Sequence, residues 1–247
     1  MKDSESAAKP AKPLGRRGYG STPHLPGSRV GPGDWTIHEG QARILTSRPR
    51  KGDRIIVTEK LDGSCTVVAR LGGDALAVTR AGYLASDSPY PQHHGFASWV
   101  AARRRSFARS LPEGVTVAGE WLLQAHGTRY RIEEEDALFV AFAAFDGKAR
   151  MPHDDARTLF REAGLRAAAV VSDGPPMTQE EAMAAIGDRG FHGALDPVEG
   201  AVWTCERDGA FDFIAKHVVA GKVDGCYLPR VSGLDDVWNY DPAAITA

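Results

Sequence analysis

Little cysteine, no long apolar run and no excess of positive charge distinguish this sequence, and each absence excludes a class of protein. The three cysteines, Cys65, Cys205 and Cys226, lie far apart and form no CxxC pair, which argues against a zinc site and against a disulfide framework. No segment approaches the roughly 20 consecutive apolar residues that cross a bilayer, and the first residues lack the apolar core of a signal peptide. We therefore expect a cytoplasmic protein with no membrane partner.

The balance of charge restricts how the chain could meet nucleic acid. Its 30 Lys and Arg against 32 Asp and Glu give a formal net charge of -2, whereas proteins that track phosphates usually carry a basic excess. Any such contact must then be local. The best local patch is the run AARRRSFARS with Arg103, Arg104, Arg105 and Arg109, although such a run is more often the solvated face of a helix.

The chain is long enough, at 247 residues with 43% hydrophobic, to bury one large core. Residues 1–17 are rich in Lys, Ala, Ser and Pro and have almost nothing apolar to bury, which predicts a disordered tail. Residues 18–34 are dense in Gly and Pro, and a loop of this length inside a compact domain indicates a function. We expect residues 18–247 to form a single domain, with no large C-terminal domain.

Short β-rich runs separated by turn signals make up most of the chain from residue 54 onward. We expect antiparallel strands at 54–59, 64–71, 75–80, 115–122, 137–146, 198–207 and 211–218. The spacing of apolar residues predicts one amphipathic helix at 95–110, and helix-start signals predict two more at 153–163 and 178–187. Strands with interspersed helices and no regular βαβ alternation indicate an α+β fold of packed antiparallel sheets with flanking helices.

The tetrapeptide KLDG at residues 60–63 is the first candidate for chemistry. Gly63 permits a turn at the end of a strand, so the amine of Lys60 would project into a cleft. Alone, a KxDG tetrapeptide is usually a surface turn. Here further motifs follow in order, each within or at the end of a predicted strand: TRAGY with Arg80, GEW with Glu120, FAAFD with Phe142 and Phe145, EGAV with Glu199, and IAKHV with Lys216.

Through these motifs the sequence resembles the covalent nucleotidyltransferase superfamily of polynucleotide ligases and capping enzymes, over roughly residues 54–218. Within it the chain is most similar to ATP-dependent RNA ligases. Ser64 and Cys65 stand where DNA ligases usually carry an arginine, and Arg80 stands where RNA ligases carry theirs. The resemblance implies a nucleotidyltransferase (adenylation) domain that joins 5′-phosphate and 3′-hydroxyl ends through a lysyl-AMP intermediate and an adenylylated 5′ end.

The resemblance also implies cofactors and partners. ATP and Mg²⁺ or Mn²⁺ would be the cofactors, and RNA ends or a nicked RNA duplex would be the substrate. An end-healing kinase-phosphatase would be a partner. Lys60 would be the nucleophile, Asp62 and Gly63 would shape its loop, and the backbone of Glu59 would read the adenine edge.

The remaining motifs receive roles in the same way. Arg80 and Glu120 would contact the ribose or the phosphates. Phe142, or otherwise Phe145, would stack on the adenine, since residues that alternate along a strand cannot both face the cleft. Glu199 would bind the metal, which is a hard ion suited to carboxylates.

Phosphate binding falls to the last motif. The resemblance gives the α-phosphate to Lys216. Ile214 stands where the family commonly has an earlier lysine, which leaves Lys216 or the nearby Lys222 to do the work of both lysines. An amine attacks a phosphoanhydride only when it is unprotonated, so we expect the pKa of Lys60 to fall below its usual value near 10.4 under the influence of Lys216, Lys222 and Arg80.

Other functions stay open at this point. A DNA nick ligase or a guanylyltransferase would use the same chemistry, although the short chain after Lys216 disfavours both. A catalytically decayed nucleic-acid-binding relative is a third alternative, which the substitution at Ile214 keeps open. His24 and Ser28 of the Gly-Pro loop are further candidates for contact with nucleotide phosphates.

Overall fold

The computed structural model describes residues 12–245, and residues 1–11 and 246–247 lie outside the part described. The predicted disordered tail therefore falls mostly outside it. Residues 12–17 have defined contacts, since Leu14 packs against a small apolar cluster and the guanidinium of Arg16 donates to the carbonyl of Gly147. Among the helices of residues 12–245, none is long and apolar enough to cross a membrane.

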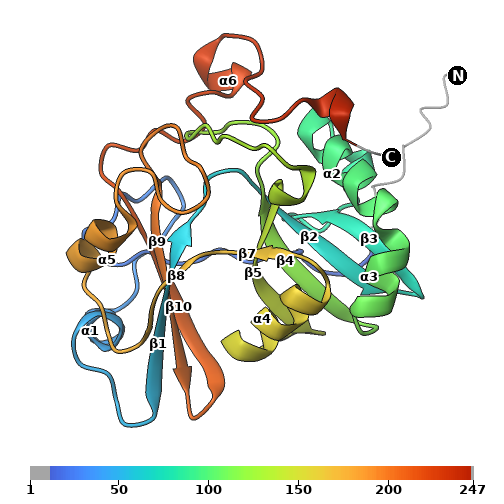
Figure 1. Cartoon of the computed structure of the whole chain (residues 1–247). Helices are drawn as coiled ribbons and strands as arrows, with labels where there is room; N and C mark the ends of the chain where they lie inside the picture. The colour runs from blue at the N-terminus through green and yellow to red at the C-terminus, as the bar shows by residue number, and fades with distance from the viewer. Residues whose placement is uncertain (1–11, 246–247) are drawn as a thin grey trace, which may run out of the picture.

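Two sheets lie side by side (Figure 1). The first is antiparallel and has the order β10-β9-β1-β8, from strands β1 (Asp53–Lys60), β8 (Val170–Gly174), β9 (Gly200–Arg207) and β10 (Ala210–Val218). The second has the order β3-β2-β4-β5-β6, from β2 (Ser64–Leu71), β3 (Asp74–Thr79), β4 (Val115–Trp121), β5 (Phe139–Asp146) and β6 (Ala149–Arg150). The short strand β7 (Arg166–Ala167) pairs with β5 in parallel. The expected α+β class is therefore confirmed, and residues 61–63 form the crossing from one sheet to the other.

Helices cover the outer faces of the two sheets. The α-helices are α1 (Glu39–Thr46), α2 (Pro91–Ala102), α3 (Arg104–Ser110), α4 (His153–Glu162), α5 (Gln179–Ile186) and α6 (Pro229–Ser232), and 3-10 turns are η1 (Ala85–Asp87), η2 (Glu135–Ala137) and η3 (Pro242–Ala244). Helices α1 and α5 pack on the first sheet, and α2 and α3 pack on the second (Figure 1). Helix α4 contacts β5 and β7.

The single helix expected at 95–110 is wrong, because the chain forms α2 and α3 with a break at Arg103. The backbone of Arg103 has φ -97 and ψ 5, outside the helical geometry. Its guanidinium bonds to Glu135 and Asp136 and lies 4.6 Å from the centre of the Trp99 ring. Apolar residues keep their helical spacing through the break, so periodicity alone does not reveal it. The two other predicted helices and the seven predicted strands are present, with ends shifted by one or two residues.

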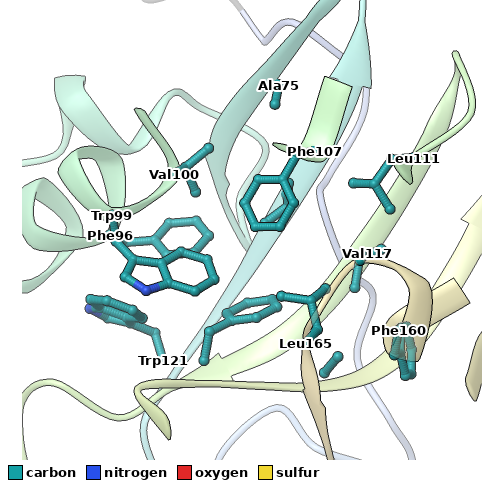
Figure 2. Packing of buried hydrophobic residues seen from close by; sticks show 14 of the residues in the cluster. Ala75, Phe96, Trp99, Val100, Phe107, Leu111, Val117, Trp121, Phe160 and Leu165 are labelled. Carbon is teal, nitrogen blue, oxygen red and sulfur yellow. The ribbon is translucent and has the colours of Figure 1, made fainter. Parts of the chain in front are cut away.

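Each sheet turns one face to its helices and the other face to the space between the sheets. In β9, Trp203 and Cys205 belong to the core under α1 and α5, whereas the neighbouring Val202 and Thr204 line a cavity. Under α2 and α3, Phe96, Trp99 and Trp121 form an aromatic cluster (Figure 2). This alternation leaves the inner faces free to carry polar and charged side chains.

Replacing Phe96 by alanine is expected to lower the free energy of unfolding by about 3–5 kcal/mol. The ring is fully buried, and its centre lies 5.5 Å from that of Phe139 and 5.3 Å from that of Trp121. Urea unfolding followed by tryptophan fluorescence measures the change. Phe191→Ala is the control, because the side chain of Phe191 is 55% exposed. Equal losses in the two variants would contradict this packing.

Candidate active site

A cavity of 790 Å³ lies between the inner faces of the two sheets. Side chains from every predicted motif line it, although the motifs are spread over most of the chain. They are Lys60, Asp62, Gly63, Arg80, Glu120, Phe142, Glu199 and Lys216, and Ile214 lies among them. Glu59 lines it as well, whereas Lys222 does not.

The amine of Lys60 is held at the end of β1 by a carboxylate. Its Nζ lies 2.7 Å from Oε2 of Glu199 and 3.3 Å from the carbonyl of Leu61. The two side chains meet because Lys60 pairs with Gly200 across β1 and β9, which places Glu199 beside the strand end. Gly200 has φ +155, and a Cβ there would lie 1.9 Å from the carbonyl oxygen of His217, so β10 requires a glycine at this position.

The pKa of Lys60 is shifted in the direction opposite to our expectation. Burial lowers it, but Glu199 and then Glu120 raise it by more, and the pKa lies above its ordinary value. The prediction of a depressed pKa is therefore wrong for this arrangement. The physical reason is that carboxylates, and not the cations named from the sequence, are the nearest charges to the amine.

The pKa values of both glutamates lie above the ordinary value of a carboxyl group. Burial raises the pKa of Glu120 to about 7, an effect that Lys60 opposes and Glu199 reinforces. Burial also raises the pKa of Glu199, again against the effect of Lys60. Two buried carboxylates around one amine form a set of oxygen donors that fits a divalent cation, because such an ion would relieve their mutual repulsion.

The turn after Lys60 is fixed from the second sheet and from the loop that follows β4. Oε1 of Glu120 accepts from the N–H of Gly63 at 3.0 Å, and a Cβ on Gly63 would lie 2.5 Å from the carbonyl oxygen of Trp121. Oδ2 of Asp62 accepts from the N–H of Gly127 at 2.9 Å. These contacts leave little freedom for the direction of the Lys60 side chain.

Lys222 is buried behind this turn. Its Nζ pairs with Oδ2 of Asp62 at 2.8 Å and donates to the hydroxyl of Thr128. Only 5% of its side chain is exposed. The expectation that Lys222 grips a phosphate or depresses the pKa of Lys60 does not fit this position, and the structure instead makes Lys222 the partner of Asp62.

Lys216 projects from β10 toward the cavity and meets Asp34, whose Oδ2 lies 3.5 Å from its Nζ. The same carboxylate oxygen lies 2.9 Å from Nε2 of His24. Burial, and then the charge of Lys60, lower the pKa of Lys216 below its ordinary value. Asp34 and the more distant Glu199 oppose this shift, and Asp34 is the carboxylate that pairs directly with Lys216.

The Gly-Pro loop forms an extra strand-like segment beside Lys216. The N–H of Lys216 donates to the carbonyl of Pro23, and the N–H of Leu25 donates to the carbonyl of Lys216, both at 2.8 Å. His24 is buried, and its Nδ1 lies 2.7 Å from the hydroxyl of Ser28. Neither His24 nor Ser28 lines the cavity. Their expected contact with phosphates stays a prediction, whereas the backbone of the loop bonds to the backbone of Lys216.

The two phenylalanines of the FAAFD strand lie on the same side, contrary to our expectation. Both rings contact Tyr19: the ring centre of Phe142 lies 5.1 Å from that of Tyr19, and the ring centre of Phe145 lies 6.1 Å from it. The register shifts here, since Ala118 pairs with Ala143 and Gly119 with Ala141, so that Phe142 is an extra residue in a β-bulge. Phe142 lines the cavity and Phe145 does not.

Glu59 and Arg80 also line the cavity. The N–H of Glu59 already donates to the carbonyl of Ala169, and its side chain accepts from the N–H of Phe191 at 2.8 Å. Burial raises the pKa of Glu59 to about 7. The guanidinium of Arg80 donates to the hydroxyl of Ser21 at 3.1 Å and pairs with no carboxylate within residues 12–245.

Several residues of the site carried no sequence signal. Nε2 of His126 lies 3.1 Å from Oε1 of Gln92 and 3.4 Å from the hydroxyl of Ser64, and His126 lines the cavity. The hydroxyl of Tyr130 accepts from the N–H of Asp62 at 3.0 Å. Both residues lie in the irregular segment that follows the GEW motif. The polar residues of that segment were the one sequence feature that could have pointed to them.

The basic run on α2 and α3 contributes nothing to the cavity. Arg103 pairs with Glu135 at 3.1 Å and with Asp136 at 2.6 Å, and Arg104 pairs with Asp74. These carboxylates neutralise the first half of the run. The reading of the run as a solvated helix face therefore fits better than a phosphate contact.

Comparisons with known proteins bear on the fold and the family of the chain. Solved structures with the same fold include a lysine-to-alanine variant of the Naegleria gruberi RNA ligase with ATP and Mn, at a TM-score of 0.50 and 17% identity over 85% of this chain and 62% of that chain. An apo variant of the same ligase has a TM-score of 0.50 and 16% identity over 72% of this chain and 52% of that chain. An archaeal ATP-dependent RNA ligase has a TM-score of 0.46 and 18% identity over 67% and 42% of the two chains.

The chain spans about half the length of the Naegleria gruberi ligase, since the alignment with its complex with ATP and Mn covers 51% of that chain. No curated protein matches the sequence. The family model for RNA ligase matches residues 53–218, which include the motifs from KLDG to IAKHV and most of both sheets. On this match, the chain belongs to the RNA ligase family.

Proposed function

We propose that the chain is an ATP-dependent RNA ligase that joins a 5′-phosphate to a 3′-hydroxyl through AMP carried on Lys60 and then on the 5′ end of the RNA. The observation that carries the proposal is the Lys60 amine, held 2.7 Å from Glu199 in a cavity that Glu120, Phe142 and Lys216 also line. Membership of the RNA ligase family supports it. The ATP and Mn named for the Naegleria gruberi ligase support the choice of cofactors.

The first step forms a bond between Nζ of Lys60 and the α-phosphorus of ATP and releases pyrophosphate. Glu199 and Glu120 would hold the divalent cation, which would neutralise their charge and stabilise negative charge on the phosphates. When Glu199 no longer pairs with Lys60, burial and the positive charge of Lys216 favour the neutral amine. The amine then gives up its proton and becomes nucleophilic.

The other side chains would orient the nucleotide. Phe142 would stack on the adenine, and the backbone of Glu59 would read its edge through the carbonyl, since the N–H is already bonded. Arg80 would contact the ribose or the phosphates, and Lys216 would exchange Asp34 for the α-phosphate. Asp62 and Gly63 would hold the turn that aims Lys60.

The intact mass of the purified protein after incubation with ATP and Mg²⁺ tests the reaction class. We expect the mass of one AMP to be added and both Lys60→Ala and Lys60→Arg to abolish the addition, because a guanidinium stays protonated and cannot attack. Sealing of an RNA nick should also be lost in both variants. Lys51→Ala is the matched control, since Lys51 is exposed and lies away from the cavity. An AMP adduct that persists in either Lys60 variant would place the nucleophile elsewhere.

In the absence of ATP, the raised pKa of Lys60 means that its amine becomes neutral and reactive only at high pH. Removing the negative charge with Glu199→Gln leaves burial as the main influence, so the pKa falls and the neutral amine appears at lower pH. We expect a downward shift of about one pH unit or more. Acetylation of Lys60 at a series of pH values, measured by peptide mass spectrometry with Lys51 as the internal reference, gives the shift. A pKa of Lys60 that stays the same or rises in Glu199→Gln would refute the ion pair.

Lys216→Ala and Lys222→Ala are expected to fail in different ways. Loss of Lys216 should slow AMP transfer about tenfold or more, because one phosphate contact disappears, with little change in stability. Loss of Lys222 leaves Asp62 without its buried partner and should lower the free energy of unfolding by about 3–5 kcal/mol. Single-turnover AMP transfer and urea unfolding separate the two effects. Slower AMP transfer in Lys222→Ala than in Lys216→Ala would mean that the phosphate lysine is assigned wrongly.

A further inference from the structure

Two tyrosines from the segment between β3 and α2 line the cavity and have no part in the site as described so far. Tyr83 is 36% exposed and Tyr90 is 50% exposed, and both line the cavity that also contains Lys60. Neither hydroxyl has a hydrogen-bond partner in the part of the chain that the structure describes. Large exposed aromatic rings that pack into no core are available to a ligand.

Both rings are nevertheless held in place. Tyr83 ends a turn after β3, where its carbonyl accepts from the N–H of Thr79 at 2.8 Å and from the hydroxyl of Thr79 at 3.2 Å. Tyr90 precedes α2 as its N-cap. Its ring meets the edge of the His93 ring at 88° with centres 5.6 Å apart, and His93 is fixed by the hydroxyl of Ser88 at 2.6 Å. An edge contact braces the Tyr90 ring without covering both of its faces.

We propose that Tyr83 and Tyr90 form a stacking surface for bases of the single-stranded RNA end that is brought to Lys60. The inference rests on the proposed function, because it assigns these tyrosines to the second substrate. The nucleotide is expected on the central strands beside Phe142, and Tyr83 and Tyr90 lie outside those strands, in the segments that follow β3. The RNA end must enter the same cavity for its phosphate to reach the AMP on Lys60.

The chemistry of the two tyrosines favours a base over an apolar protein segment. Stacking on aromatic rings tolerates every base and is the usual way in which proteins hold single strands. The Nζ of Lys12 lies over one face of the Tyr83 ring, 4.8 Å from its centre, which places a positive charge at the stacking surface and leaves the opposite face of the ring for a base. The run at Arg103 and Arg104 cannot supply an alternative phosphate track, since carboxylates already pair with both residues.

Binding of a fluorescently labelled single-stranded RNA, measured by anisotropy at fixed salt, tests the surface. We expect Tyr83→Ala and Tyr90→Ala each to raise the dissociation constant about 5- to 150-fold. Tyr90→Trp should retain the affinity, because a larger ring still stacks. Phe191→Ala is the matched control, an exposed aromatic residue that does not line this cavity, and it should bind RNA as the unaltered chain does.

Two measurements keep this inference separate from the proposed function. If the unaltered chain gains no AMP but loses RNA affinity with Tyr90→Ala, the ligase proposal fails and the stacking surface stands. If the chain gains AMP while both alanine variants bind RNA as Phe191→Ala does, the surface is overturned and the ligase proposal stands. Absence of RNA binding by the unaltered chain overturns the surface, as does a dimer that Tyr90→Ala dissociates in size-exclusion chromatography, because a second copy would then occupy the surface.

Discussion

The ion pair of Lys60 with Glu199 lies where the chain crosses from the first sheet to the second. Its 2.7 Å separation depends on the pairing of β1 with β9 and on the turn at residues 61–63. Charges this deeply placed are unfavourable unless they are matched, so the surrounding groups depend on one another. Asp62 needs Lys222, and the ionisation of Glu120 responds to Lys60. A change at one member therefore alters the charge state of the others.

Much of the fold could be predicted from the sequence, because its strands are rich in β-branched residues and its turns are marked by glycine. The strands β1, β2 and β9 appear within two residues of their expected ends. The short strand β8 was not predicted, because its five residues VVSDG end in Asp173 and Gly174, which are typical of a turn. The bulge at Phe142 was equally hidden, because it arises from the register with β4 and not from the residue itself.

The candidate site, like the fold, could be predicted only in part from the sequence. The residues within motifs could be named in advance and lie around one cavity, with the exception of Lys222. Asp34 and Tyr130 could not, because each contacts a site residue that is distant in sequence. The direction of the Lys60 pKa was predicted wrongly for a related reason. A sequence names the charges that a site contains, but their order of distance from one amine is a property of the packed structure.

The backbone bonds between residues 23–25 and Lys216 have a consequence for synthesis on the ribosome. They join a segment near the start of the described chain to one near its end. The first sheet needs β9 and β10 as well, so its early strand β1 must wait for partners that emerge much later. A nascent chain can build the aromatic core around Phe96 before β9 and β10 emerge, but Lys216 gains its backbone partners in residues 23–25 only after β10 has been made. Chains that end before β9 would consequently hold β1 without the strand that places Glu199 beside Lys60.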